Sequence, residues 1–297
     1  LQHEAGLKKG DRIALMMPNV LQYPIALFGA LRAGLTVVNT NPLYTARELE
    51  HQLRDSGARA IVVFENAAHV LEEIRGETAV ETVIVTGIGD QLGFPKSALV
   101  NFVLRHVKQL VKPFQLPGAV RFNEVLQQGK WVDLQRVEIG HPDIAFLQYT
   151  GGTTGVSKGA ILTHHNMVAN ILQTHAWLGQ YDIKLESPVI LCALPLYHIY
   201  ALTSCCLSWL LEGGHNVLCT QAWKDSVKLG LHEPMFEFLR RLGGETPELA
   251  RAEAVWRRVL AMPPEQALCI STCLLRIFPL PLKKIVFMSS PPISLTK

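Results

Sequence analysis

The chain has 297 residues, of which 48% are hydrophobic and 18% are charged, and its formal net charge is +3. This composition is typical of a globular protein with a sizeable core, and it argues against global disorder. Residues 1–220 hold 17 Lys and Arg against 18 Asp and Glu, so no nucleic-acid-binding surface is expected there.

Strands and helices alternate at short intervals in the first 86 residues. We expect strands at 12–17, 36–39, 60–64 and 82–86, and helices at 20–34, 45–56 and 66–75. Thr45 with Glu48 three residues later predicts a capping box, and Gly57 predicts the end of that helix. This alternation predicts an α/β fold, with a parallel sheet and helices on its faces.

Residues 97–112 form a candidate basic amphipathic helix. Its apolar residues recur at helical spacing, and Arg105, Lys108 and Lys112 supply positive charge. One interpretation is a helix on a membrane surface that helps to deliver an apolar substrate. The alternative, which the base rates for such helices favour, is an ordinary helix packed on the domain.

A short helix is expected around residues 122–126, a buried strand over 144–149 and a helix over 165–178. Residues 187–211 contain no Asp, Glu, Lys or Arg, and their length would allow a membrane span. Pro188 and Pro195 argue against a continuous helix there. A buried strand followed by a buried helix is the preferred interpretation.

The cysteines and histidines do not predict a metal site. The six cysteines form no C-x-x-C pair, and several lie in apolar runs, so reduced buried thiols in a cytoplasmic compartment are expected. The first residues, LQHEAGLKKGD, are polar and unlike a signal peptide. Because the chain also begins without Met, we expect it to be a fragment at its front.

The most informative stretch is residues 149–160, YTGGTTGVSKGA. Glycines let successive backbone N–H groups turn toward one point, and threonine hydroxyls and Lys158 add donors and positive charge. The apolar strand before this loop favours a polyphosphate site over an ordinary surface turn. The pattern is not a Walker loop, because Ser157-Lys158-Gly159 stands where Gly-Lys-Ser/Thr is required, and Gly159 to Thr163 are expected to be extended.

The stretch L-x-x-T-G-G-T-T-G-x-S-K, residues 147–158, resembles the phosphate-loop signature of the adenylate-forming enzymes, which include acyl-CoA synthetases and luciferases. The likeness is greatest to bacterial long-chain fatty-acid–CoA ligases, and it extends from residue 1 to about Cys219. Segments 10–19, 39–53, 159–170 and 194–202 carry it as well. The resemblance implies that residues 1–220 are part of the large N-terminal adenylation domain, and that the C-terminal domain is absent.

The resemblance also implies a reaction and its participants. A fatty acid, ATP and coenzyme A would be the substrates and Mg²⁺ the metal, with Thr153 as its ligand, Lys158 and His198 in catalytic roles, and Tyr197 and His198 lining the acyl site. A peripheral contact with the inner membrane face is a further expected interaction; the patterns indicate no oligomeric state. The expected nucleotide-binding residues are Tyr149, Thr150, Gly151, Gly152, Thr153, Thr154, Gly155, Val156, Ser157, Lys158, Gly159 and Ala160.

Residues 221–297 do not resemble the family. They hold 8 of the 17 prolines, and the later family motifs for magnesium, ribose and the catalytic lysine of the C-terminal domain are absent. A frameshift is the first explanation, followed by a genuine extension and a chimeric gene; reading the DNA of codons 210–297 in all three frames distinguishes them. We therefore expect an inactive, truncated ligase, with a non-catalytic ATP- or phosphate-binding remnant and a membrane protein as alternatives.

Overall fold

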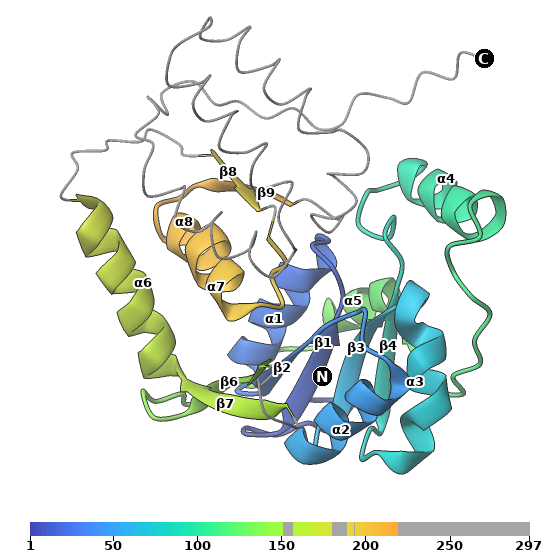
Figure 1. Cartoon of the computed structure of the whole chain (residues 1–297), viewed down its shortest axis with the longest axis horizontal. Helices are drawn as coiled ribbons and strands as arrows, with labels where there is room; N and C mark the ends of the chain where they lie inside the picture. Colours follow the sequence, from blue (N-terminus) through green and yellow to red (C-terminus); the bar gives the residue numbers. More distant parts are fainter. Residues whose placement is uncertain (151–156, 180–188, 193, 219–297) are drawn as a thin grey trace, which may run out of the picture.

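The computed structural model describes residues 1–150, 157–179, 189–192 and 194–218 (Figure 1). Its main element is a seven-stranded sheet in the order β5-β4-β3-β1-β2-β6-β7. All neighbouring strands pair in parallel except β6 and β7, which are antiparallel. The strands are β1 (Arg12–Met16), β2 (Thr36–Thr40), β3 (Ala60–Phe64), β4 (Thr82–Thr86), β5 (Val120–Arg121), β6 (Ile144–Thr150) and β7 (Lys158–Thr163).

Helices cover both faces of this sheet, as the alternation of elements predicts. Neighbouring strand residues point to opposite faces, so Ile13 and Leu15 of β1 enter one hydrophobic cluster and Ala14 and Met16 enter another. The first cluster includes residues of α1 (Gln22–Arg32) and α5 (Phe122–Gly129). The second includes residues of α2 (Ala46–Ser56) and α3 (Ala68–Ile74), which lie in front of the sheet in Figure 1. The 3-10 turns η1 (Glu65–Ala67) and η2 (Arg75–Glu77) flank α3.

Helix α2 begins and ends where its sequence predicts. The Thr45 hydroxyl accepts a hydrogen bond from the Glu48 backbone, and the Glu48 carboxylate accepts one from the Thr45 backbone, which confirms the capping box. Gly57 ends the helix with φ 60, a left-handed conformation that favours glycine. A Cβ there would lie 2.7 Å from Nη2 of Arg12, so a larger residue would also displace the end of that side chain.

The segment after β7 builds a second, smaller layer. Helix α6 (His164–Gly179) confirms the helix expected at 165–178. Strand β8 (Val189–Cys192) pairs in parallel with β9 (His215–Leu218), and α7 (Ile199–Ala201), the π-helical turn η4 (Leu202–Leu207) and α8 (Ser208–Leu211) follow one another between them. This arrangement confirms a strand followed by a helix. In the part of the chain that the structure describes, no helix is long and apolar enough to cross a membrane.

Cysteines of this layer lie in apolar surroundings, as expected. Cys192 and Cys206 are buried, and desolvation raises the pKa of the Cys206 thiol to about 11. Cys219, Cys269 and Cys273 lie outside the described residues. The described ranges also contain no group of three His, Cys, Asp or Glu side chains that could hold a metal ion.

The expected amphipathic helix is present, and only part of its apolar side is packed. It consists of α4 (Lys96–Phe102) and the π-helical turn η3 (Val103–Val107), and no residue of either is fully buried. Figure 1 shows α4 standing apart from the sheet at the right edge of the molecule. The interpretation as an ordinary packed helix fits the half-buried Val100, Val103 and Leu104, but not the exposed Leu99, Phe102 and Val107.

Candidate functional site

The glycine-rich segment joins two antiparallel strands at the edge of the sheet. Strand β6 ends at Thr150 and β7 begins at Lys158, and these two residues pair across the ladder. The extended conformation expected for Gly159 to Thr163 is confirmed. The predicted site residues Gly151, Gly152, Thr153, Thr154, Gly155 and Val156 lie outside the described residues, and so does the expected magnesium ligand among them.

Side-chain contacts fix the two ends of this segment. The Ser157 hydroxyl donates a hydrogen bond of 2.9 Å to the carbonyl of Thr150, which closes the base of the loop. From α2, Nε2 of His51 donates to the carbonyl of Ser157 at 2.8 Å, so this nitrogen carries the proton. The strand ladder and α2 thus hold Thr150 and Ser157, the two described residues at the ends of the glycine-rich segment.

Tyr149 makes a second connection between this hairpin and α2. Its ring is buried over Gly159, and its hydroxyl donates to the carboxylate of Asp55. The ring of His51 meets the Tyr149 ring edge-on, with centroids 6.5 Å apart. Desolvation, followed by the hydrogen bond to Asp55, holds the pKa of Tyr149 well above its usual value, so the phenol remains a donor.

We expect Gly159→Val to disturb this packing. A Cβ at Gly159 would already lie 3.0 Å from the ring of Tyr149, and the two γ-methyl groups of valine would push the ring away from Asp55. Overpacking of this kind costs about 1–3 kcal/mol, which urea unfolding would measure. Ala160→Val is the matched control, since Ala160 is an exposed neighbour in the same strand. Equal stability of the two variants would contradict the packing role of Gly159.

Lys158 and Thr150 are exposed residues on the opposite face of the hairpin from Tyr149. Side chains alternate along a strand and directly paired residues share a face. Lys158 and Thr150 therefore share a face with Gln148, while Gly159 shares a face with Tyr149. Of the predicted nucleotide-binding residues, the structure places Thr150, Lys158 and Ala160 on this face of the hairpin and Tyr149 and Gly159 on the opposite face, with Ser157 at the base of the loop.

Tyr197 and His198 lie beside β6 on the face that carries Gln148. The amide nitrogen of Gln148 donates to the carbonyl of Tyr197 at 3.2 Å, and the rings of Tyr197 and His198 lie 4.6 Å apart. Desolvation raises the pKa of the buried Tyr197 phenol, with a smaller contribution from Tyr44, and it lowers the pKa of His198. At neutral pH the site thus presents a neutral imidazole with one exposed side and a protonated phenol.

A chain of buried polar side chains holds this segment against the sheet. Asn39 of β2 donates to Oε1 of Gln148 at 3.0 Å and accepts from the hydroxyl of Tyr23 at 2.8 Å. The Tyr23 hydroxyl also lies 3.0 Å from the carbonyl of Leu196, and Gln52 of α2 donates to the carbonyl of Asn39 at 2.9 Å. We call these four side chains (Tyr23, Asn39, Gln52 and Gln148) the buried polar chain.

Asn19 extends this connection to the next part of the segment. Its amide nitrogen donates to the carbonyls of Cys192 and Leu194, both at 2.8 Å, and its oxygen accepts from the backbone N–H of Leu196 at 2.8 Å. Asn19 is 3% exposed. A buried side chain that satisfies three backbone groups fixes the path of the chain on its way to Tyr197.

These polar residues were not among the residues predicted for the site. A signal was present, because Asn39 ends the apolar run TVVN and Gln148 stands within IAFLQY. A polar residue inside a strand that is otherwise apolar requires buried hydrogen-bond partners.

The described residues fit part of what a nucleotide would need. Lys158 supplies a cation, and Thr150 and Ser157 supply hydroxyls at the base of the loop. Among the described residues, no group of three His, Cys, Asp or Glu side chains could hold a metal ion beside them. The arrangement can hold an anion beside the pair of aromatic rings at Tyr197 and His198.

Comparisons with known proteins identify one family. The family model described as AMP-binding enzyme matches residues 1–233. A long-chain-fatty-acid–CoA ligase of Escherichia coli O157:H7 is 56% identical over 220 residues, which is 74% of this chain and 39% of that protein. One of Bacillus subtilis (strain 168) is 38% identical over 202 residues, which is 67% of this chain and 35% of that protein.

Solved structures show the same fold. A long-chain-fatty-acid-CoA ligase from Archaeoglobus fulgidus matches with a TM-score of 0.52 and 26% identity, over 73% of this chain and 36% of that one. An anthranilate CoA ligase in complex with anthranoyl-AMP matches with a TM-score of 0.57 and 19% identity, over 75% of this chain and 38% of that one. The chain therefore spans less than half the length of the relatives it matches.

Proposed function

The chain belongs to the AMP-binding enzyme family, and from this membership we propose that it forms part of a long-chain fatty-acid–CoA ligase. The observation that carries the proposal is the 56% identity over 220 residues to a relative with that name. The geometry supports it, since Lys158 and the segment with Tyr197 and His198 lie on one face of β6.

The proposed reaction has two steps. An oxygen of the fatty carboxylate attacks the α-phosphorus of ATP, pyrophosphate leaves, and an acyl-adenylate forms. The thiol of coenzyme A then loses its proton and attacks the acyl carbon, and AMP leaves with the bonding electrons. Because carboxylate and polyphosphate are both anionic, catalysis depends on neutralising charge and on positioning the two groups.

Individual roles for the residues follow from this reaction. We propose that Lys158 and the backbone N–H groups of the loop hold the terminal phosphates of ATP, and that Tyr197 and His198 line the entrance for the acyl chain. Mg²⁺, with Thr153 as a proposed ligand, would neutralise phosphate charge when bound. The lowered pKa of His198 supports this role, because a neutral imidazole presents less charge to an apolar chain.

The second candidate is a binding protein without catalysis. The chain spans 39% of the length of the Escherichia coli O157:H7 relative, so catalysis by this chain alone is not implied by the match. On this proposal, residues 1–297 bind ATP but form no acyl-CoA. We also propose a cytoplasmic location with a peripheral membrane contact, which suits an enzyme whose substrate partitions into lipid.

A chimera tests the proposed function. We would replace the matching segment of the Escherichia coli O157:H7 relative with residues 1–220 of this chain and measure ATP-dependent formation of long-chain acyl-CoA. At 56% identity we expect activity within about tenfold of the unmodified relative, since volume-conserving differences are tolerated best. The control is residues 1–297 alone, for which saturable ATP binding without turnover is expected. A folded chimera that binds ATP but activates no fatty acid would contradict the ligase assignment.

A further inference from the structure

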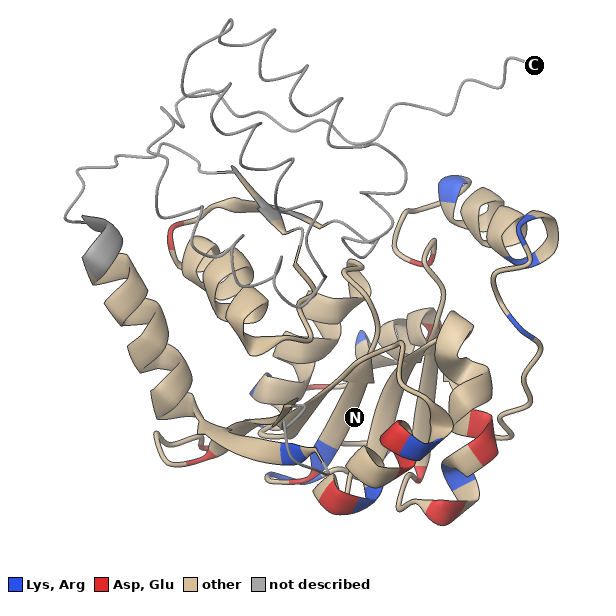
Figure 2. Ribbon diagram, in the orientation of Figure 1, with Lys and Arg blue, Asp and Glu red and all other residues tan. Residues whose placement is uncertain are grey.

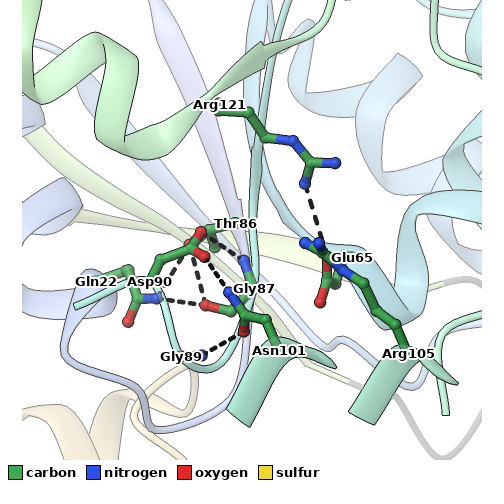
Figure 3. A network of polar contacts seen from close by, with 9 residues as sticks. All are labelled: Gln22, Glu65, Thr86, Gly87, Gly89, Asp90, Asn101, Arg105 and Arg121. Carbon is green, nitrogen blue, oxygen red and sulfur yellow. Dashed lines mark hydrogen bonds and ion pairs between the residues drawn. The ribbon is translucent and has the colours of Figure 1, made fainter. Parts of the chain in front are cut away.

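The segment α4–η3 is attached to the body of the protein through its polar side. The amide nitrogen of Asn101 donates to Asp90 at 2.8 Å, and its oxygen accepts from the backbone N–H of Gly89 at 2.8 Å. One turn later, Nε and Nη2 of Arg105 donate to the same oxygen of Glu65 at 3.0 and 2.6 Å. Figure 3 shows both side chains reaching from the helix into this network.

The network behind these contacts is buried and fixed. Glu65 is 1% exposed, and Arg121 of β5 lies 3.6 Å from the oxygen that Arg105 binds. The second oxygen of Asp90 accepts from the backbone N–H of Gly87 at 2.7 Å (Figure 3). A Cβ at Gly89 would lie 2.7 Å from Oδ1 of Asn101, so the helix approaches this turn as closely as glycine allows. Charged and polar groups thus contribute to fixing the orientation of α4–η3.

Only part of the apolar surface of the segment is covered. Val100, Val103 and Leu104 are half-buried, whereas Leu99 is 65% exposed, Phe102 57% and Val107 67%. A surface helix of a globular protein normally buries its apolar stripe, and this helix leaves three large apolar side chains of that stripe uncovered. We call its exposed apolar residues, together with those just before and after it, the outer face: Leu92, Phe94, Leu99, Phe102, Val107 and Leu110.

The segment that carries the outer face has basic residues only, whereas the carboxylates that it contacts, Asp90 and Glu65, lie on its inner side. From residue 91 to residue 123 the sequence has five Lys and Arg and no Asp or Glu. Figure 2 shows basic residues along α4–η3 and no acidic residue on it. Four of the basic or ionisable side chains line a hollow beside the helix around Glu65, namely Arg105, His106, Lys112 and Arg121.

We propose that the outer face binds the surface of a membrane that contains anionic phospholipid. Exposed leucine, phenylalanine and valine side chains suit the boundary between headgroups and acyl chains, and flanking lysines suit anionic headgroups. The charge argues against an apolar protein groove or a second copy as the occupant, because two copies would bring like charges together. This inference names the surface for the membrane contact proposed above, and it does not depend on ligase chemistry.

Vesicle flotation with the whole chain tests the proposal. The chain is expected to float with vesicles of phosphatidylcholine and phosphatidylglycerol, and to lose that binding in pure phosphatidylcholine or in high salt. Leu99→Glu with Phe102→Glu should lower partitioning at least about a hundredfold, because two apolar side chains no longer insert. Val168→Glu with Leu172→Glu is the matched control on α6, where both residues are also exposed.

A second double variant changes the charge of the segment without changing its apolar residues, so a loss of binding would not reflect disturbed packing. Lys108→Gln with Lys112→Gln leaves the apolar residues in place and should lower partitioning about thirtyfold, at about a factor of five for each charge near an anionic surface. ATP binding should be unchanged in every variant, which separates this proposal from the proposed function. Equal loss in the α6 control, equal binding to neutral vesicles, or self-association that Leu99→Glu abolishes would each overturn it.

Discussion

Replacing Asn39 with leucine is expected to lower the free energy of unfolding by about 3 kcal/mol. Leucine has nearly the same shape, but it neither donates to Gln148 nor accepts from Tyr23. Tyr23 keeps the carbonyl of Leu196 as an acceptor, whereas Oε1 of Gln148 is left buried without its donor. The loss therefore combines two hydrogen bonds with the cost of one unsatisfied buried oxygen. Urea unfolding of the purified chain measures it.

Asn170→Leu is the matched control for this substitution. Asn170 is exposed on α6, so the same change there should alter the free energy of unfolding by less than about 0.5 kcal/mol. A small effect at Asn39 would mean that water replaces the buried polar chain. Combining Asn39→Leu with Gln148→Leu extends the test, because removing both partners should recover part of the loss.

Lys158→Ala is expected to weaken ATP binding by about ten- to a hundredfold. A charge-assisted hydrogen bond to a phosphate contributes roughly 1.5–3 kcal/mol, and the substitution removes the cation that the hairpin presents beside Thr150. Calorimetric titration of the purified chain with ATP measures the change. The same substitution in the chimera should lower acyl-CoA formation to a similar or greater extent.

The control is Lys130→Ala, which removes an exposed lysine at the end of α5. Its ammonium group donates to Gln127 at 3.1 Å, and nothing places it near the hairpin. It should leave the dissociation constant for ATP unchanged. If Lys158→Ala binds ATP as tightly as the unmodified chain, the loop does not hold the phosphates through this residue.

Local patterns were sufficient to predict most elements of the first 86 residues. The strand over 60–64 and the strand over 82–86 agree with β3 and β4, because apolar runs between turn residues have few other solutions in an α/β chain. The capping box at Thr45 was equally predictable, since all its parts lie within four residues. None of these predictions required knowledge of which strands pair with one another.

The contacts that build the site were beyond such patterns. Gln148 and Tyr197 are 49 residues apart, and Asn19 meets Leu196 across 177 residues. The sequence around Gln148 or Asn19 does not specify which residue is the partner, although a polar residue in an apolar strand predicts that a partner exists. The orientation of α4–η3 was unpredictable for a related reason, because helical periodicity identifies an apolar side but not what covers it.

The buried polar chain and Asn19 affect the order in which hydrogen bonds can form while the chain is being synthesised. Tyr23 and Asn39 leave the ribosome early, but the carbonyl of Leu196 and the backbone N–H that Asn19 binds follow more than 150 residues later. Until then, Asn19 lacks its three backbone partners and Tyr23 lacks one of its two acceptors. Contacts of such long range form slowly, so the nascent sheet is exposed to competing interactions for most of translation.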